Sequence, residues 1–255
     1  INPRMTLEST LVAEFSEIEQ SGDIQNKRDF SFLKPKLDYR FNISSALQLR
    51  GTLEKVVSQL SFADFSRSTN PDDRDQDTRA GNPQLEPEES LRAEMGLDYR
   101  LPNDSGTLNS RLFYYDFDNK IGRIDISTSP TNLQSTNGNV GTGYATGLAL
   151  NGTIRLGFLN LPSAMVTANV TVQRSRFDHD PFTTPIRHGF FPYDRGGYGL
   201  NFRHDVASMN LNYGFTFSAR IRDNRFGYEN DSRTYLPYPH RINTWVEKTG
   251  LWNLT

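Results

Sequence analysis

The chain has 255 residues, a formal net charge of −2 and no cysteine, and 35% of its residues are hydrophobic. The balanced charge gives no basic footprint for nucleic acid, and the lack of cysteine excludes disulfides and thiolate metal sites. No run approaches the roughly 18 apolar residues that a membrane-spanning helix needs, so a helical membrane bundle is also excluded.

Apolar and polar residues alternate from the start of the chain. Met5, Leu7 and Leu11 occupy odd positions of the first segment, while Thr6 and Glu8 occupy even ones. Similar alternation, of varying strength, recurs in segments 5–16, 33–41, 47–54, 91–101, 108–114, 148–154, 166–173, 198–203, 209–218 and 241–247, and residues 251–255 resemble an eleventh that is cut off. A period of two predicts β-strands, each with one apolar and one polar face.

The connections between these segments alternate strictly in length. Short ones cover residues 42–45, 102–106, 157–163, 204–207 and 248–250, and long ones cover residues 19–29, 55–90, 118–143, 175–196 and 219–240. In an antiparallel meander every second connection lies at the same end of the sheet, so all long loops gather at one rim. Transmembrane β-barrels have this asymmetry, with short periplasmic turns and long extracellular loops.

The predicted fold class is therefore all-β, an antiparallel transmembrane β-barrel meander that is incomplete, with about ten to eleven strands of a larger barrel. The polar face carries many charges, at Lys34, Lys36, Asp38, Arg40, Arg50, Glu54, Arg92, Glu94, Asp98 and Arg100. A Lys or Arg that faces lipid at the bilayer midplane costs roughly 2–4 kcal/mol, so this face should meet water or a plug. We expect a wide barrel with a polar lumen.

The most specific local motif lies at the end of the longest loop. It reads Gly81-Asn82-Pro83-Gln84-Leu85-Glu86-Pro87-Glu88 and leads into the strand that begins near Leu91. The two prolines hold the residues before them extended, which stiffens the return of the loop to the wall. This stretch resembles the Gly-Asn-Pro-x-Leu-x-Pro-Glu signature of TonB-dependent outer-membrane receptors. Residues 112–121, Leu-Phe-Tyr-Tyr-Asp-Phe-Asp-Asn-Lys-Ile, also look like a strand-to-loop passage of that family.

The resemblance implies a barrel of about 22 strands, filled by an N-terminal plug, in the cell outer membrane. It also implies uptake of a scarce small-molecule nutrient, such as a ferric siderophore, with energy from the TonB complex. The chain lacks a plug domain, a TonB-contacting segment and a closing strand that ends in an aromatic residue. We therefore expect residues 1–255 to be a barrel-domain fragment that contacts membrane lipid and couples to TonB through a plug outside this chain.

A mixed aromatic and cationic loop is the best candidate for ligand binding. Its residues are Arg176, His179, Arg187, His188, Phe190, Phe191, Tyr193 and Arg195. Such groups can hold an anionic or aromatic ligand by stacking and charge-assisted hydrogen bonds. The alternative interpretation is an interfacial aromatic belt with a solvated rim.

No motif predicts catalysis, a cofactor or a metal site. The four histidines show no pair at metal-binding spacing, and no Gly-x-Ser-x-Gly or Ser, His and acid arrangement occurs. We therefore expect a protein that is not an enzyme. Two alternatives to the receptor remain at this stage, a passive outer-membrane channel and a soluble β-sandwich that binds carbohydrate.

Overall fold

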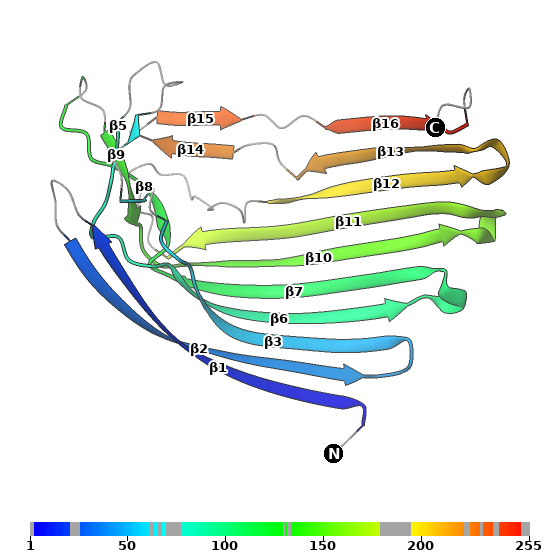
Figure 1. The fold of residues 1–255 in the computed structure, drawn as a ribbon, viewed down its shortest axis with the longest axis horizontal. Helices are drawn as coiled ribbons and strands as arrows, with labels where there is room; N and C mark the ends of the chain where they lie inside the picture. Colours follow the sequence, from blue (N-terminus) through cyan, green and yellow to red (C-terminus); the bar gives the residue numbers. More distant parts are fainter. Residues whose placement is uncertain are drawn as a thin grey trace.

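The computed structural model describes residues 3–20, 26–61, 64–65, 68–69, 78–129, 131, 134–178, 195–221, 225–229, 232–236 and 240–250. Ten of its strands form one sheet in chain order, with every neighbouring pair antiparallel (Figure 1). They are β1 (Met5–Gln20), β2 (Asn26–Asn42), β3 (Leu47–Val57), β6 (Glu89–Arg100), β7 (Gly106–Asp118), β10 (Gly143–Leu156), β11 (Leu161–Phe177), β12 (Gly196–Val206), β13 (Leu211–Arg220) and β16 (Arg241–Lys248).

All ten predicted strands are confirmed, and so is the incomplete barrel. The sheet is curved and open, with β1 at one edge and β16 at the other (Figure 1). The eleventh segment, residues 251–255, lies outside the described residues. Among the described residues, no helix is long and apolar enough to cross a membrane.

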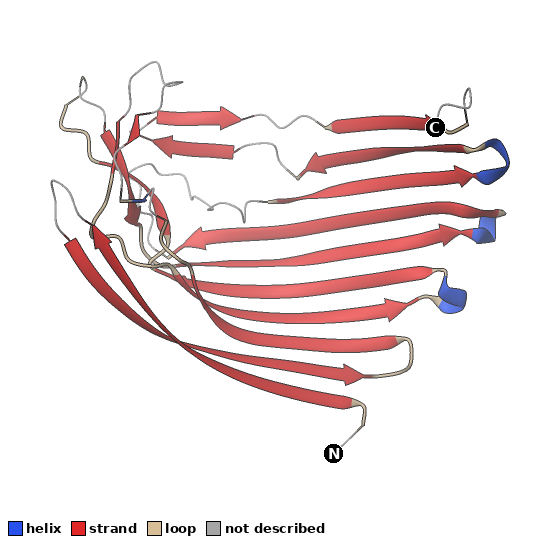
Figure 2. Cartoon of the chain, in the orientation of Figure 1, coloured by secondary structure: helices blue, strands red, loops and turns tan. Residues whose placement is uncertain are grey.

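The two ends of the sheet differ as the loop lengths predict. Tight turns join the strands at one end, and the long connections gather at the other (Figures 1 and 2). Three of these turns contain a short 3-10 segment: η2 (Pro102–Asp104), η3 (Gly157–Leu159) and η4 (Ala207–Met209). The last two close on Asn160 and Asn210 in the left-handed region, with φ of 60° and 48°, a conformation that Asn tolerates better than most residues. Because these asparagines set the turns, the predicted bounds 157–163 and 204–207 are off by a few residues.

The long connections are more ordered than the sequence indicates. Four of their strands form a small separate sheet in the order β4-β5-β9-β8, and β14 pairs with β15 in a hairpin. Their bounds are Ser68–Thr69 for β4, Thr78–Ala80 for β5, Ile121–Asp125 for β8, Gln134–Asn139 for β9, Arg225–Glu229 for β14 and Ser232–Leu236 for β15. β5 and β9 pair in parallel, so two different long connections meet beyond the end of the main sheet.

The distribution of exposure is opposite to that of a soluble protein. Along β6, the apolar side chains of Leu91 and Met95 are exposed, while the charged Arg92 and Glu94 between them are half-buried. Apolar exposure runs across the whole sheet, from Leu11 at 64% and Phe15 at 81% to Val246 at 73%. Along β6 the polar side is the less exposed, inner side of the curved wall, and the apolar side is outward. This is the arrangement of a membrane barrel, whose outside meets lipid.

Candidate functional site

The first half of the inner face, over β1, β2, β3, β6 and β7, is charged, and many of its charges are paired. Arg50 holds Asp98 through two nitrogens, with Nε 2.5 Å from Oδ2 and Nη2 2.8 Å from Oδ1. Asn109 Nδ2 donates a further hydrogen bond of 2.6 Å to Asp98 Oδ1. A forked arginine contact of this kind fixes both geometry and charge.

Other carboxylates of this half are compensated in the same way. The ion pairs are Lys34 with Glu14, Lys36 with Asp38 at 3.1 Å and Glu54 at 3.9 Å, and Arg111 with Glu94 at 3.0 Å. Thr52 Oγ1 also donates to Asp38 Oδ1 at 2.8 Å. The carboxylates named here are therefore occupied by groups of the wall itself.

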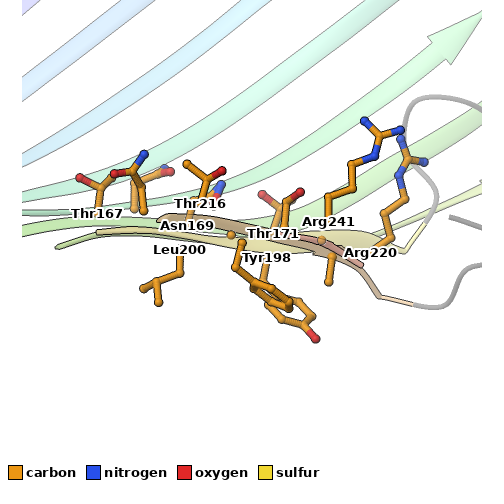
Figure 3. Close-up of a pocket in the computed structure, with 15 residues that line it drawn as sticks. Thr167, Asn169, Thr171, Tyr198, Leu200, Thr216, Arg220 and Arg241 are labelled. Carbon is orange, nitrogen blue, oxygen red and sulfur yellow. The ribbon is translucent and has the colours of Figure 1, made fainter. Parts of the chain in front are cut away.

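The second half of the inner face, over β10, β11, β12, β13 and β16, is lined by amides and hydroxyls. By strand register the amide and hydroxyl residues on this face include Asn151, Thr153, Thr167, Asn169, Thr171, Gln173, Asn201, Thr216, Ser218 and Asn243. An open concavity of about 730 Å³ lies over them. Figure 3 shows Thr167, Asn169 and Thr216 on one side of the sheet, with Tyr198 and Leu200 on the opposite, outer side.

Two arginines lie at the long-loop end of this concavity. Arg220 pairs with Gly197 across β13 and β12, and Arg241 pairs with Ser218 across β16 and β13. Both residues therefore belong to the inner face, and Figure 3 shows both side chains rising on the same side of the sheet. They bring positive charge to the long-loop end of this wall, whereas Arg203, Asp205 and Glu247 lie on the same face near the short turns.

The Gly-Asn-Pro motif forms a clasp between two long connections at the end of the charged half. Asn82 Nδ2 donates to the Asn137 carbonyl at 2.8 Å, and Asn139 Nδ2 donates to the Glu86 carbonyl at 2.9 Å. The Glu86 amide donates in return to Asn139 Oδ1 at 2.9 Å. Leu85 between them is fully buried. We call residues 82–88, together with Asn119, Lys120, Asn137 and Asn139, the loop clasp.

Charged contacts strengthen the loop clasp. Glu88 Oε2 lies 2.7 Å from Lys120 Nζ and accepts from the Ile121 amide at 3.1 Å. Both side chains of this pair are largely buried, at 12% and 16% exposed. Arg28 of β2 donates to the Leu85 carbonyl at 2.7 Å and lies 3.7 Å from Glu86. The motif is thus a structural fastening of the loops to each other and to the wall.

An aromatic cluster on the inner face lies beside the loop clasp. Its buried members are Phe113, Tyr115, Phe117, Ala145 and Phe177, with Val140 packed against them. Cations cover three of the rings: Arg111 lies 5.4 Å from the Phe113 ring, Arg92 lies 5.2 Å from Tyr115, and Lys120 lies 5.0 Å from Phe117. The cluster gives the loop end of the charged half a packed core, as cation–π contacts and ring stacking favour.

The structure places only two of the predicted ligand-binding residues. Arg176 lies on the outer face of β11, because its neighbour Phe177 is buried on the inner one, and it pairs with Tyr144. Arg195 is exposed at the rim, and its carbonyl accepts from the Gln173 amide at 3.3 Å. The other six, His179, Arg187, His188, Phe190, Phe191 and Tyr193, lie outside the described residues.

The sequence analysis missed the arginine pair, because Arg220 fell in a predicted loop and Arg241 at the start of the weakest strand. A signal was present nonetheless. Arg220 continues the polar positions Thr216 and Ser218 of its strand, and Arg241 precedes Asn243 at the same spacing. Strand alternation carried to the last residue would have placed both on the inner face.

The chemistry that these groups offer is recognition. Among the described residues, no three His, Asp or Glu side chains gather where they could hold a metal ion. Exposed amides and hydroxyls can donate and accept hydrogen bonds, and guanidinium groups bind oxyanions with a fixed fork. The inner face of the second half is therefore suited to a polar ligand that carries negative charge.

Comparisons with known proteins agree with this architecture. The sequence model of the family described as TonB dependent receptor-like, beta-barrel matches residues 13–255. No curated protein sequence matches the chain. Among solved structures, a mutant of the ferric enterobactin receptor PfeA from Pseudomonas aeruginosa has a TM-score of 0.61 at 14% identity, over 96% of this chain and 35% of that one.

Two further structures resemble the chain. The copper transporter OprC has a TM-score of 0.71 at 11% identity, over 96% of this chain and 37% of that one. The ferric yersiniabactin uptake receptor FyuA from Yersinia pestis has a TM-score of 0.56 at 18% identity, over 87% of this chain and 30% of that one. At these identities the likeness concerns the fold. The chain spans about a third of the length of each of these proteins.

Proposed function

The chain belongs to the TonB-dependent receptor β-barrel family, and we propose that it forms part of the wall of an outer-membrane importer for a scarce small-molecule nutrient. The observation that carries this proposal is the two-faced curved sheet. Its exposed apolar side suits lipid, its polar side suits a wet lumen, and its long connections gather at one rim.

The rest of the barrel must come from outside these ten strands. The outer edges of β1 and β16 have no partner strand among the described residues. Open backbone groups at a sheet edge are very costly in lipid, where no water can satisfy them. We therefore place the chain in a longer protein that completes the wall, carries a plug and couples to TonB through it.

A chelated metal is the cargo that we propose. The similar structures are described as receptors for ferric enterobactin and ferric yersiniabactin and as a copper transporter. A ferric siderophore fits the amide, hydroxyl and arginine lining of the inner wall, because such chelates present many oxygen atoms to hydrogen-bond donors.

The connection 175–196 remains a proposed ligand contact at the outer rim. Arg195 supports it, since this cation is exposed beside the long-loop end of the lumen wall. Arg176 faces the outer side of β11 and would reach a ligand only from above the rim.

A soluble β-sandwich would need a second sheet to cover the apolar face. Among the described residues no sheet does so, and Leu7, Leu11 and Phe15 are 62%, 64% and 81% exposed. A patch of this extent on a soluble monomer would drive association. The outer-membrane proposal gives the same face a lipid environment.

Uptake of radioactive metal tests the proposal. A strain that lacks the gene for the full-length receptor is compared with its parent for uptake from iron and copper chelates, with and without a proton-motive-force uncoupler. We expect the parent alone to take up at least one chelate, and the uncoupler to abolish that uptake. Uptake by the parent that is unchanged by the uncoupler would indicate a passive channel instead. Equal uptake by both strains would contradict the proposal.

A further inference from the structure

We propose that Arg174 and Arg176, at the long-loop end of β11, bind the phosphate of an anionic lipid headgroup on the outer side of the wall. The inference rests on the proposed position of the chain in the outer membrane. It names the partner of one lipid-facing surface, whereas the proposed import concerns the opposite face of the sheet.

Strand register places both arginines on the outer face. Arg174 pairs with Thr146 and Arg176 with Tyr144, whereas the neighbouring Phe177 is buried on the inner face. Both arginines are exposed, and β11 runs toward the long-loop end of the sheet (Figure 1). Because they are two residues apart on a strand, their Cα atoms lie roughly 7 Å apart. One phosphate group can therefore accept hydrogen bonds from both side chains.

The two arginines lie where the outer face changes from apolar to polar. The outward positions before them on β11 are Val170 and Val172, which are 38% and 53% exposed. Their partners on β10, Leu150 and Leu148, are 43% and 40% exposed. The next outward position after the arginines is the exposed Asp178. In a membrane-spanning wall this change marks the level of the lipid headgroups, where basic side chains attract anionic lipids.

Two tyrosines lie at the same level of the outer face. Tyr144 is opposite Arg176, and the Arg174 guanidinium lies 5.8 Å from the Tyr144 ring. The ring of Tyr144 stacks on that of Tyr114, with centroids 6.0 Å apart and an interplanar angle of 15°. Tyrosine is enriched at membrane interfaces. A guanidinium held over a ring keeps its N–H groups directed along its own plane, where they can donate to phosphate oxygens.

Two lysines on the same outer rim have carboxylate partners. Lys27 Nζ lies 3.0 Å from Glu17, and Lys55 Nζ lies 2.5 Å from Glu89. By register both lysines continue the outward positions of their strands. Within the described part of the chain, no such ion pair includes either of the two arginines. The arginines should therefore attract an anion more strongly than the two lysines do.

The described acids near the arginines on this face are Asp116 and Asp178. Asp116 pairs with Tyr144, so β10 separates it from Arg176, by about 10 Å at the usual spacing of strands. Asp178 follows two residues after Arg176, and its carboxylate accepts a hydrogen bond of 2.7 Å from Thr142 Oγ1. Neither acid lies on the apolar side of the arginines, where the acyl chains of a bound lipid would run.

Lipid binding to the full-length receptor tests the inference, with dioleoyl phosphatidic acid and dioleoylglycerol as probes that differ only in the phosphate. Native mass spectrometry of the delipidated receptor in detergent measures the bound fraction of each probe over a concentration series. The double variant R174Q/R176Q removes both positive charges and keeps hydrogen-bonding side chains. We expect it to bind phosphatidic acid about tenfold or more weakly than the parent protein, because two charge-assisted contacts are lost. Dioleoylglycerol should bind weakly and equally to both proteins.

K27Q/K55Q is the matched control, because it removes two positive charges from the same face and rim, where each is paired with a carboxylate. This variant should bind phosphatidic acid as the parent protein does, and the gel mobility of unheated samples checks that every variant folds. Unchanged phosphatidic acid binding in R174Q/R176Q, an equal loss in K27Q/K55Q, or equal binding of both probes by the parent protein would overturn the inference. Chelate uptake that depends on the proton-motive force would still support the proposed function, so the two failures are distinguishable.

Discussion

The two halves of the inner wall follow the same alternation of polar and apolar residues, but their polar side chains differ in kind. Over β1 to β7, Arg50 with Asp98 and Lys36 with Asp38 and Glu54 satisfy one another inside the wall. Over β10 to β16, amides and hydroxyls line an open concavity that ends in two arginines. Strand parity decides which side chains belong to the inner face, whereas the choice of residue decides whether that face carries ion pairs or neutral hydrogen-bonding groups.

The loop ends of the halves differ in the same sense. The loop clasp and the aromatic cluster cover the wall around β6 and β7, with Leu85 fully buried and Phe117 2% exposed. The arginines at the loop end of the second half line an open concavity. The loop end of the first half is thus packed and hydrogen-bonded, whereas the second half borders an open concavity.

Among the changes considered, removal of the Leu85 side chain, which anchors the loop clasp, should reduce stability the most. Leu85→Ala leaves a cavity in a fully buried position, which typically costs about 2–5 kcal/mol. The free energy of unfolding in urea should fall by that amount, and the two long connections should become sensitive to protease. Gln84→Ala is the control, because Gln84 is exposed and uses only its backbone amide; equal effects of both changes would contradict the role of Leu85.

Both halves of the wall share an apolar outer face. A charged side chain placed on that face should therefore be costly in either half. Leu150→Arg places a cation on the outer face in the middle of β10, at a cost of about 2–4 kcal/mol near the bilayer midplane. Asn151→Arg places the same cation at the next residue of β10, which points to the inner face of the sheet. Folding into lipid vesicles should be weakened by the first change and nearly unaffected by the second, and the opposite order would mean that the faces are reversed.

The buried ion pair of the loop clasp should contribute less than Leu85. Lys120→Met leaves the Glu88 carboxylate without its cation while the Ile121 amide still donates to it. We expect the free energy of unfolding to fall by about 1–3 kcal/mol. The double change Lys120→Met with Glu88→Leu should recover part of this loss, because it removes the stranded charge; no recovery would mean that the pair acts only through packing.

The smallest effect is expected in the charged wall itself. Asp98→Asn removes a half-exposed partner of Arg50, and ion pairs in such positions contribute about 0.2–1 kcal/mol. Uptake of iron and copper chelates by the full-length receptor should not change, since Asp98 lies outside the concavity over β10 to β16. A strong loss of uptake would mean that the charged half also takes part in transport.

Much of the fold could be predicted because apolar and polar residues alternate along each strand. The turn bounds could not, since Asn160 and Asn210 adopt left-handed conformations that alternation does not encode. The small sheet of the long connections was also missed, because β5 and β9 pair across more than 50 residues of separate loops. The arginine pair combines both difficulties: each residue follows the polar parity, but their proximity depends on the pairing of β13 with β16.

Spin labels in the full-length receptor in lipid report which side of the wall faces the bilayer. The chain has no cysteine, so single cysteines can replace Leu11 and Val170 on the outer face and Thr10 and Asn169 on the inner face of the two halves. We predict high collision rates with lipid-dissolved oxygen at Leu11 and Val170, and low rates at Thr10 and Asn169. High oxygen rates at the inner positions of either half, with low rates at the outer ones, would mean that the polar side faces the lipid.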